Sequence, residues 1–279
     1  MQLKEIESCE IIVKSYAKIN IFLKIVGKTQ IKGVYYHLLQ SRFMRLPFLY
    51  DTLGFQFDTE SFNVSGNFDC KLEQNTIYKA FNALLPHIAP IKQNALKHSA
   101  VFVKKEIPSG GGLGGGSANA ACFLQVANRA LELGLSDEAL MHIGAEVGSD
   151  VPFFLSGLEI ANVTGRGEII TPCDEKPFLV DIIQPNCHCS TAEVFAKYAQ
   201  EFYDSKKIAQ TLKESWLEKP NAEILKQDSL CVNDLLAPLL KLYPQLESYR
   251  KHAFLSGSGS CFWHIPNALE SRDYAREVL

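Results

Sequence analysis

Hydrophobic and polar positions alternate along an early stretch of the chain, residues 11–26. The apolar positions on one face of this pattern are Ile19, Ile21, Leu23 and Ile25. The positions on the opposite face are Lys18, Asn20, Phe22 and Lys24. Successive side chains of a β-strand point to opposite faces, so alternation of this kind is typical of a strand. The pattern therefore predicts a strand over 11–26 with one apolar and one largely polar face.

The following segments predict more strands and a first helix. Residues 35–57 are rich in aromatic side chains and β-formers, which favours a strand, interrupted at Pro47 and at Asp51. Residues 100–105 predict another strand. Between them, residues 75–85 carry an apolar stripe at helical spacing and predict a helix. The members of that stripe are Ile77, Ala80, Phe81 and Leu84.

The second half of the chain alternates again between helical and strand patterns. A helix is predicted to be capped at Ser117 or its neighbour and to end at Gly134, and a second helix covers 136–147. Further helices are predicted over 191–202 and 209–216. The predicted strands of this half are 158–163, 168–171, 178–183 and 261–263. These elements predict an α+β protein.

Length and composition indicate a globular protein of two domains. The 279 residues are 47% hydrophobic and 21% charged, which excludes wholesale disorder. We place the boundary near 163–167, giving domains over 1–163 and 164–279. The formal net charge of -3 offers no general electrostatic reason to bind nucleic acid or an anionic membrane. The expected partner is a small molecule, with no nucleic acid and no membrane, and the chain is expected to be a monomer or a homodimer.

The termini and the cysteines favour a cytoplasmic protein. The first residues are acidic and interrupted by charge, unlike a signal peptide, and no apolar run approaches the roughly 20 residues of a membrane span. The eight cysteines are scattered, so we expect no disulfide framework. Only Cys187-His188-Cys189 resembles a local ligand cluster, and no second pair follows at a zinc-site spacing. A metal site there is a weaker interpretation than a reduced loop or strand.

One segment departs from the ordinary composition. Six glycines lie within Gly110–Gly116, broken only by Leu113, between a predicted strand and a predicted helix. Glycine has the highest entropy cost on folding, so such a run is expected where the backbone must curl tightly and approach a ligand. A loop that leads into a helix N-terminus presents free N–H groups to an anion. The alternative is a flexible linker, but an amphipathic helix follows at once, so we favour a phosphate site.

Known phosphate loops fit this run unequally. The P-loop needs a lysine before its Ser or Thr, and Gly116-Ser117 has none. The dinucleotide pattern is formally met by Gly110, Gly112 and Gly115, with Glu132 at a suitable distance, but a run of glycines satisfies almost any glycine motif. The protein-kinase loop needs H-R-D and D-F-G partners, and neither occurs in the sequence.

A fourth loop fits in detail. The segment Pro108–Ser117 resembles the ATP loop of the GHMP small-molecule kinases, a group that includes the galactose, homoserine and mevalonate kinases. Its Gly114–Ala121 part is similar to the form found in the diphosphocytidyl-methylerythritol kinases of the non-mevalonate isoprenoid pathway. Further blocks resemble that branch in the same order along nearly the whole chain. They are Ala17–Leu23, Tyr36-His37, Gly148–Phe154, Gly165–Glu168 and Ser256–Cys261.

The resemblance implies a fold and a reaction. The implied fold is a two-domain α+β GHMP kinase, with an N-terminal domain like ribosomal protein S5 and a ferredoxin-like C-terminal domain. The implied reaction is ATP-dependent phosphorylation of the 2-hydroxyl of 4-diphosphocytidyl-2-C-methyl-D-erythritol, a cytidine diphosphate sugar alcohol. Lys18 and Asp150 match the catalytic positions: Asp150 as proton acceptor, and Lys18 to stabilise the developing alkoxide and keep Asp150 ionised. Without the resemblance, the favoured interpretations are a solvated edge-strand lysine for Lys18 and a helix cap for Asp150.

The same resemblance implies the binding residues. It assigns ATP to the contiguous residues Pro108, Ser109, Gly110, Gly111, Gly112, Leu113, Gly114, Gly115, Gly116, Ser117 and Ala118. Mg²⁺ is expected with ATP; Ser117 can offer it a hydroxyl, and Ala118 stands where a second serine is common. The implied acceptor-binding residues are Asn20, Tyr36, His37, Thr191 and Phe195, with the cytosine stacked between Tyr36 and Phe195 and read by His37.

Three alternatives remain at this point. Another GHMP kinase of the homoserine or mevalonate type would use a different acceptor, and Tyr36, His37 and Phe195 argue against it. A nucleotide-binding protein without catalysis would not need both Lys18 and Asp150. A dehydrogenase would bind NAD(H). The residues before Tyr36-His37 also depart from the usual acidic-Gly pattern, which leaves the geometry of that loop open.

Overall fold

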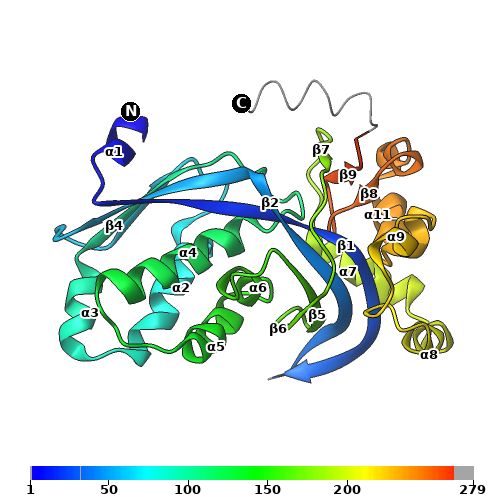
Figure 1. The fold of residues 1–279 in the computed structure, drawn as a ribbon, viewed down its shortest axis with the longest axis horizontal. Helices are drawn as coiled ribbons and strands as arrows, with labels where there is room; N and C mark the ends of the chain where they lie inside the picture. The colour runs from blue at the N-terminus through cyan, green and yellow to red at the C-terminus, as the bar shows by residue number, and fades with distance from the viewer. Residues whose placement is uncertain (1, 32, 267–279) are drawn as a thin grey trace.

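The early alternating stretch forms one arm of a long antiparallel β-hairpin. The computed structural model describes residues 2–31 and 33–266. Strand β1 (Ile11–Ile31) pairs with β2 (Val34–Phe57) from Ile11 opposite Phe55 to Ile31 opposite Val34. The strand predicted over 11–26 is therefore correct but continues further. In Figure 1 the hairpin runs across the molecule and curves past the helices formed by residues 191–242.

A six-stranded sheet is built on this hairpin, with β1 along one edge of β2. The other edge of β2 pairs with two strands in turn, with β4 through residues 52–57 and with β5 through residues 39–44. The order along the sheet is β3-β4-β2-β5-β6, and only the β3–β4 pair is parallel. The bounds of these strands are β3 (Asn63–Gly66), β4 (Ser99–Lys104), β5 (Ile160–Gly165) and β6 (Ile169–Pro172).

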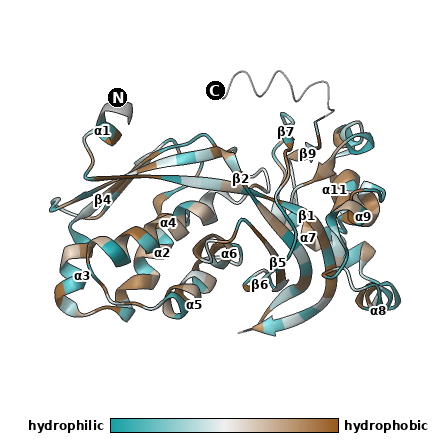
Figure 2. Cartoon of the chain, in the orientation of Figure 1, coloured by the Kyte–Doolittle hydropathy of each residue, from teal (hydrophilic) through white to brown (hydrophobic). Residues whose placement is uncertain are grey.

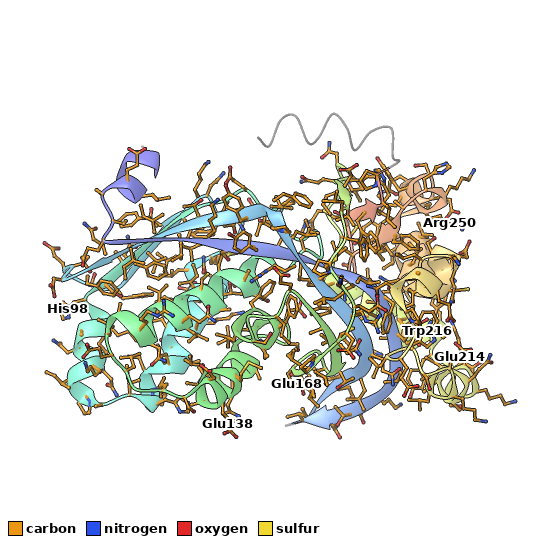
Figure 3. All side chains as sticks on the ribbon, viewed as in Figure 1. His98, Glu138, Glu168, Glu214, Trp216 and Arg250 are labelled. Atoms are coloured by element: carbon orange, nitrogen blue, oxygen red, sulfur yellow. The ribbon has the colours of Figure 1, made fainter. Side chains whose placement is uncertain are left out.

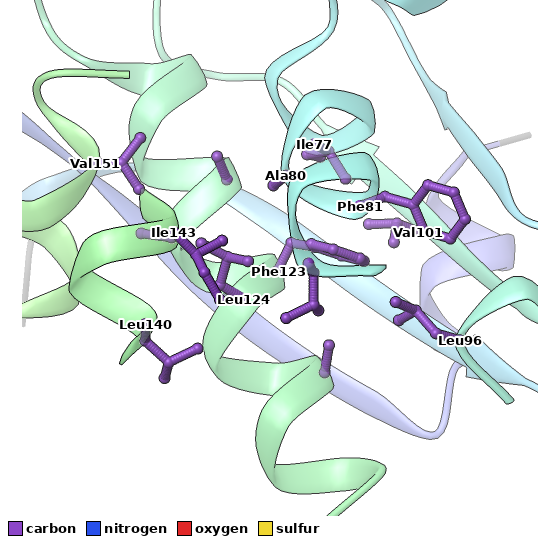
Figure 4. Packing of buried hydrophobic residues seen from close by; sticks show 14 of the residues in the cluster. Ile77, Ala80, Phe81, Leu96, Val101, Phe123, Leu124, Leu140, Ile143 and Val151 are labelled. Atoms are coloured by element: carbon purple, nitrogen blue, oxygen red, sulfur yellow. The ribbon is translucent and has the colours of Figure 1, made fainter. Parts of the chain in front are cut away.

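Helices cover one face of this sheet, and the short α1 (Gln2–Glu7) lies at the other face (Figure 1). The predicted stripe of the 75–85 segment is confirmed, because all four of its members are buried in α2. They pack with α4, α5 and the sheet in the core shown in Figure 4. The covering helices are α2 (Thr76–Leu84), α3 (Pro90–Lys97), α4 (Gly115–Ala130), α5 (Asp137–Val147) and α6 (Val151–Leu155), with single turns at Leu72–Gln74 and Leu85–His87.

The rest of the described chain forms a second group around a small sheet of order β7-β9-β8. Its strands are β7 (Asp181–Ile183), β8 (Phe254–Leu255) and β9 (Phe262–His264). Its helices are α7 (Thr191–Lys197), α8 (Ser205–Lys213), α9 (Asn221–Ile224), α10 (Ser229–Val232) and α11 (Leu236–Leu242), with shorter turns at Tyr198–Phe202, Pro244–Leu246 and Tyr249–Lys251. Figure 2 shows that α8 is largely hydrophilic, as expected for an outer helix.

The division into domains over 1–163 and 164–279 stays a proposal. Both β5 and β6 pair within the larger sheet, and the change to the smaller sheet falls between Pro172 and Asp181. A ferredoxin-like sheet has four strands, whereas three are described for the smaller sheet within residues 2–31 and 33–266. That detail also stays a prediction. None of the helices in the described residues is long and apolar enough to cross a membrane.

The predicted interruptions of the second strand take another form in the structure. Tyr16 pairs with Tyr50 and the next residue, Ala17, pairs with Leu46, so residues 47–49 bulge out while the strand continues. Proline cannot donate to the ladder, and a bulge accommodates it without ending the strand. The interruption predicted at Asp51 is wrong, because Asp51 pairs with Ser15 within the ladder.

A buried arginine links the two groups of elements. The Arg42 guanidinium on β2 donates to Asn162 Oδ1 at 2.8 Å, to Asn221 Oδ1 at 2.7 Å, and to the Leu217 and Lys219 carbonyl oxygens at 2.7 and 2.9 Å. Burial lowers the pKa of Arg42 from its ordinary value. These bonds hold residues 217–221, next to the Trp216 labelled in Figure 3, against the sheet.

We expect Arg42→Met to lower the free energy of unfolding by about 3 kcal/mol, since it leaves several buried acceptors without a donor. Urea denaturation followed by circular dichroism measures this change. Asn221→Asp is the matched control: Asn221 Nδ2 has no hydrogen-bond partner among residues 2–31 and 33–266, and Oδ1 already accepts from Arg42. That variant should stay within about 1 kcal/mol of the wild type. Equal losses in both variants would contradict the role given to Arg42.

Candidate active site

The glycine run forms a tight loop that enters helix α4. Gly110, Gly112 and Gly114 have φ values of 68°, 75° and 72°, a region that favours glycine. Gly114 occupies the N-cap position, so the predicted cap at Ser117 is wrong, and Ser117 lies in the first turn. The N–H groups of a first helical turn have no intrahelical acceptor. The loop lines a cavity of about 530 Å³. Free N–H groups at the start of a helix favour the binding of an anion in such a cavity.

A second glycine loop, residues 256–260, holds the first one in place. The Ser260 and Cys261 amides donate to the Gly110 and Gly111 carbonyl oxygens, each at 3.1 Å. The Ser256 hydroxyl donates to the Gly112 carbonyl oxygen at 2.9 Å. A Cβ atom on Gly112 would lie only 2.1 Å from the Ser256 carbonyl oxygen. The two loops therefore pack backbone to backbone, which only glycine allows.

Lys18 lies where the hairpin meets these loops. Its side chain is 3% exposed, so it is not the solvated strand lysine of the alternative interpretation. The Lys18 ammonium donates to Asn20 Oδ1 at 2.7 Å and to the Gly112 carbonyl oxygen at 3.1 Å. It also lies 4.4 Å from the centre of the Phe43 ring. A buried ammonium needs such partners to remain charged.

Asp150 completes the cluster. Its Oδ2 lies 3.2 Å from the Lys18 ammonium, and its side chain is 30% exposed. Although Asp150 stands at the N-cap position of α6, its side chain makes no capping hydrogen bond, so the helix-cap interpretation is wrong. A Cβ atom on Gly167 would lie 3.5 Å from Asp150 Oδ1, so the turn after β5 closes one side of this carboxylate. The other oxygen pairs with Lys18, and the part that stays exposed can accept a proton from a bound group.

The structure places the other predicted nucleotide residues around the same cavity. Residues 108–117 all line it, whereas Ala118 is buried and does not line it. A Cβ atom on Gly148 would lie 3.8 Å from Ser117 Oγ, so this hydroxyl faces the turn that carries Asp150. No group of three or more His, Cys, Asp or Glu side chains suited to a metal ion occurs in the residues that the structure describes.

The sequence analysis did not identify the role of Asp51, which anchors the segment just before the first glycine loop. This carboxylate is fully buried and accepts from the Glu106 and Ile107 amides, each at 2.8 Å. It also accepts from the Lys105 ammonium and from Asn119 Nδ2. A carboxylate with several donors is a strong anchor for the backbone around it. Asp51 therefore fixes the segment before the glycine loop relative to α4, and an acid in an apolar strand was the signal available.

The predicted acceptor residues Asn20, Thr191, His37 and Phe195 lie in three places. Asn20 lies beside Lys18, with its Nδ2 donating to Ser41 Oγ at 3.0 Å. Thr191 lies at the edge of the loop cavity and hydrogen-bonds to Ser258 Oγ at 2.8 Å. His37 and Phe195 stack with ring centroids 5.3 Å apart.

Tyr36 points away from its neighbour His37 on β2 and packs against Arg166. Adjacent strand residues point to opposite faces, and Tyr36 packs under the Arg166 guanidinium, 5.2 Å from its ring centre. This arrangement follows from β2 continuing as a regular strand through the segment before His37, where the sequence already departs from the usual pattern.

The Cys187-His188-Cys189 segment lies against the first glycine loop. The two sulfur atoms are 3.9 Å apart. A Cβ atom on Gly110 would lie 3.1 Å from the His188 ring, and His188 lines the loop cavity. Burial raises the pKa of the nearby Cys261 thiol to about 11, which keeps this thiol protonated and unreactive at neutral pH. Of these side chains, His188 forms part of the cavity wall.

The environment of His37 makes a titration prediction. Burial, and to a smaller extent the Lys28 ammonium, lower the pKa of His37 from its ordinary value of 6.5. The unfolded chain therefore takes up this proton first, and the free energy of unfolding should decrease as pH falls from above 6.5 through the folded-state pKa.

Nuclear magnetic resonance of the ring protons should give a His37 midpoint below 6.5. Phe195→Ala should raise that midpoint by exposing the ring, and Lys28→Gln should raise it less. A midpoint in the wild type at or above 6.5 would contradict the buried, neutral imidazole.

Comparisons with known proteins agree on one family. Residues 75–158 match the N-terminal domain of the GHMP kinases. The 4-diphosphocytidyl-2-C-methyl-D-erythritol kinase of Sulfurimonas denitrificans is 41% identical over 262 residues, covering 90% of this chain and 96% of that protein. The kinase of the same name from a Sulfurovum species is 39% identical over 260 residues, covering 91% of this chain and 98% of that protein.

Solved structures show the same fold. A crystal structure of 4-(cytidine 5'-diphospho)-2C-methyl-D-erythritol kinase matches with a TM-score of 0.70 at 24% identity, covering 96% of this chain and 94% of the other. Mevalonate kinase of Methanococcus jannaschii matches with a TM-score of 0.61 at 15% identity, covering 97% and 95%. The fold is that of the GHMP kinases, and by its identity to relatives along nearly their whole length this chain belongs to the 4-diphosphocytidyl-2-C-methyl-D-erythritol kinase family.

Proposed function

We propose that this protein is an ATP-dependent kinase that phosphorylates the 2-hydroxyl of 4-diphosphocytidyl-2-C-methyl-D-erythritol, a step of the non-mevalonate isoprenoid pathway. The observation that carries the proposal is the contact between Lys18, Asp150 and Gly112 at the mouth of the glycine loop. Phosphoryl transfer asks a protein mainly for positioning and for stabilisation of charge, together with a group that takes the proton of the acceptor. Membership of this kinase family supports the identity of the proposed acceptor substrate.

The two charged side chains divide the chemistry. Asp150 takes the proton of the acceptor hydroxyl as the oxygen attacks the γ-phosphate, and the bond from this phosphorus to the ADP oxygen breaks. The Lys18 ammonium, 3.2 Å from Asp150 Oδ2, stabilises the negative charge that develops on the attacking oxygen. Asn20 accepts from Lys18 and so orients the ammonium. Each of these roles follows from a partner within hydrogen-bonding distance.

The nucleotide phosphates are expected on the first turn of α4. The amides of Gly115, Gly116 and Ser117 begin this helix and lie in the wall of the cavity. Mg²⁺ prefers oxygen ligands and usually binds together with phosphates through few protein groups. The hydroxyl of Ser117, beside the turn that carries Asp150, fits that requirement. When bound with ATP, the ion neutralises phosphate charge.

The cytidine end of the acceptor is expected at His37 and Phe195. These stacked rings offer an apolar face to a base, and a neutral imidazole presents one donor and one acceptor to a pyrimidine edge. The lowered pKa of His37, caused by burial, keeps the imidazole neutral at pH 7. Stacking of the base between Tyr36 and Phe195 stays a prediction, as does a contact from Thr191.

An ADP-release assay with a panel of acceptors tests the function. We expect turnover with 4-diphosphocytidyl-2-C-methyl-D-erythritol and at least about 100-fold lower kcat/KM with mevalonate or homoserine, since the latter leave the cytidine site empty. Detection of the product by mass spectrometry checks the transferred phosphate. Preferred turnover of mevalonate or homoserine would assign the chain to another GHMP kinase activity, and absence of ADP release with all acceptors would contradict a kinase.

The chemistry predicts the effect of one isosteric substitution. Asp150→Asn removes the proton acceptor while preserving shape, and we expect kcat to fall by about 10²- to 10⁴-fold. Binding of ATP, measured by calorimetry, should change little because the phosphates lie on the loop. Glu159→Gln is the matched control, since Glu159 is an exposed carboxylate that pairs with Arg45. Wild-type kcat in Asp150→Asn would rule out the assigned role.

A further inference from the structure

The second glycine loop is itself held by one buried asparagine. Asn233 lies between α10 and α11, and its side chain is 1% exposed. Its Nδ2 donates to the Gly257 carbonyl oxygen at 2.9 Å and to the Leu255 carbonyl oxygen at 3.1 Å. Its Oδ1 accepts from the Leu235 amide at 2.9 Å. Both amide hydrogens are therefore used, and both point to the start of the 256–260 loop.

The segment that carries Asn233 is docked on strand β1, which also carries Lys18 and Asn20. The Asp234 amide donates to the Leu23 carbonyl oxygen at 2.9 Å, and Leu23 and Asn233 form a parallel bridge. The Asp234 carboxylate accepts from the Ile25 amide at 2.8 Å and forms a buried ion pair with Lys24. Three consecutive residues of β1 thus fix this segment, only a few residues beyond Lys18 and Asn20.

The loop that Asn233 holds reaches the reacting groups directly. A Cβ atom on Gly257 would lie 3.4 Å from Asn20 Oδ1 and 3.5 Å from the Gly112 carbonyl oxygen. Those two oxygen atoms are the acceptors of the Lys18 ammonium. Ser256 also donates to the Gly112 carbonyl oxygen. The position of the Lys18 acceptors therefore depends on the position of the 256–260 loop.

We infer that Asn233 is a positioning residue for phosphoryl transfer: it sets the 256–260 loop relative to strand β1 and thereby fixes the Gly112 carbonyl oxygen and Asn20 around Lys18. This inference rests on the proposed kinase activity for its catalytic consequence, but not for its structural one. Asn233 touches neither substrate site and acts only through the loop. Loss of its two donors frees the Leu255 and Gly257 carbonyl oxygens, so the loop is expected to shift away from Gly112.

The test uses Asn233→Asp, which keeps the size of the side chain and removes both donors, and Asn233→Ala. We expect kcat to fall by about 10- to 100-fold, as for small misplacements of reacting groups, with the acceptor KM within about twofold of the wild type. Rates are taken per folded molecule, with the folded fraction from circular dichroism. The matched control is Asn221→Asp, a buried asparagine that accepts from Arg42, and its kcat should equal that of the wild type.

A second measurement does not depend on catalysis. The Ser260 and Cys261 amides donate to the Gly110 and Gly111 carbonyl oxygens, so hydrogen exchange at these amides reports the contact between the loops. We expect exchange at both amides to be at least about tenfold faster in Asn233→Asp than in the wild type or in Asn221→Asp. Unchanged exchange in folded Asn233→Asp, or unchanged kcat, overturns the inference.

A variant of the loop itself, Ser256→Ala, keeps the inference testable where Asn233 variants are unstable, and a double-mutant cycle extends the test where they fold. Ser256→Ala removes only the hydroxyl bond to Gly112 and is expected to lower kcat as well. Because both side chains act through the same loop, the effects of Asn233→Asp and Ser256→Ala should be less than additive. Fully additive effects contradict a shared path. An inactive wild type with the expected exchange pattern would instead contradict the kinase proposal and leave the positioning of the loop intact.

Discussion

The carbonyl oxygen of Gly112 is the point on which the site depends. It accepts from the Lys18 ammonium at 3.1 Å and from the Ser256 hydroxyl at 2.9 Å. One backbone atom of the first glycine loop therefore joins strand β1 to the second glycine loop. Gly112 has a φ of 75° and no room for a Cβ atom, which ties this contact to glycine. Because the Gly112 backbone is held from both sides, its carbonyl oxygen does not need to reorganise when negative charge develops near Lys18.

The long hairpin explains how two sheets can build one site. Strand β1 carries Lys18 and Asn20 in its middle and, a few residues later, the docking contacts for Asp234. Each buried lysine of β1 has a counter-charge: Lys18 has Asp150, and Lys24 has Asp234. Breaking a buried pair leaves a charge without compensation and costs several kcal/mol. The Lys24–Asp234 pair therefore fixes the segment that carries Asn233 relative to β1. The position of the second group along β1 therefore affects the geometry of Lys18 and Asn20 beside the first glycine loop.

Local patterns predicted much of this molecule, and their failures have physical reasons. The amphipathic stripe of α2 and the caps of α5 depend on neighbours in sequence, so periodicity and capping residues sufficed. Pro47 was expected to interrupt a strand, but a bulge absorbed it. Asp51 and Asn233 could not be found in this way, because their donors and acceptors come from segments remote in the chain. The stacking of a base between Tyr36 and Phe195 came from the resemblance alone and stays a prediction; in the structure Tyr36 packs on Arg166 and Phe195 packs on His37.

The slightly acidic net charge of the chain is compatible with binding two highly charged substrates. The protein carries a formal net charge of -3, yet its loop cavity is lined by glycine amides at the start of a 16-residue helix. Amides fixed by packing bind an anion through short, directed hydrogen bonds, which salt screens less than it screens exposed charges. At the other end, the His37–Phe195 wall offers stacking and a neutral imidazole. Under the proposed function, recognition at both ends would depend on preorganised, largely uncharged groups, and the paired charges of Lys18 and Asp150 would lie where phosphorus changes partners.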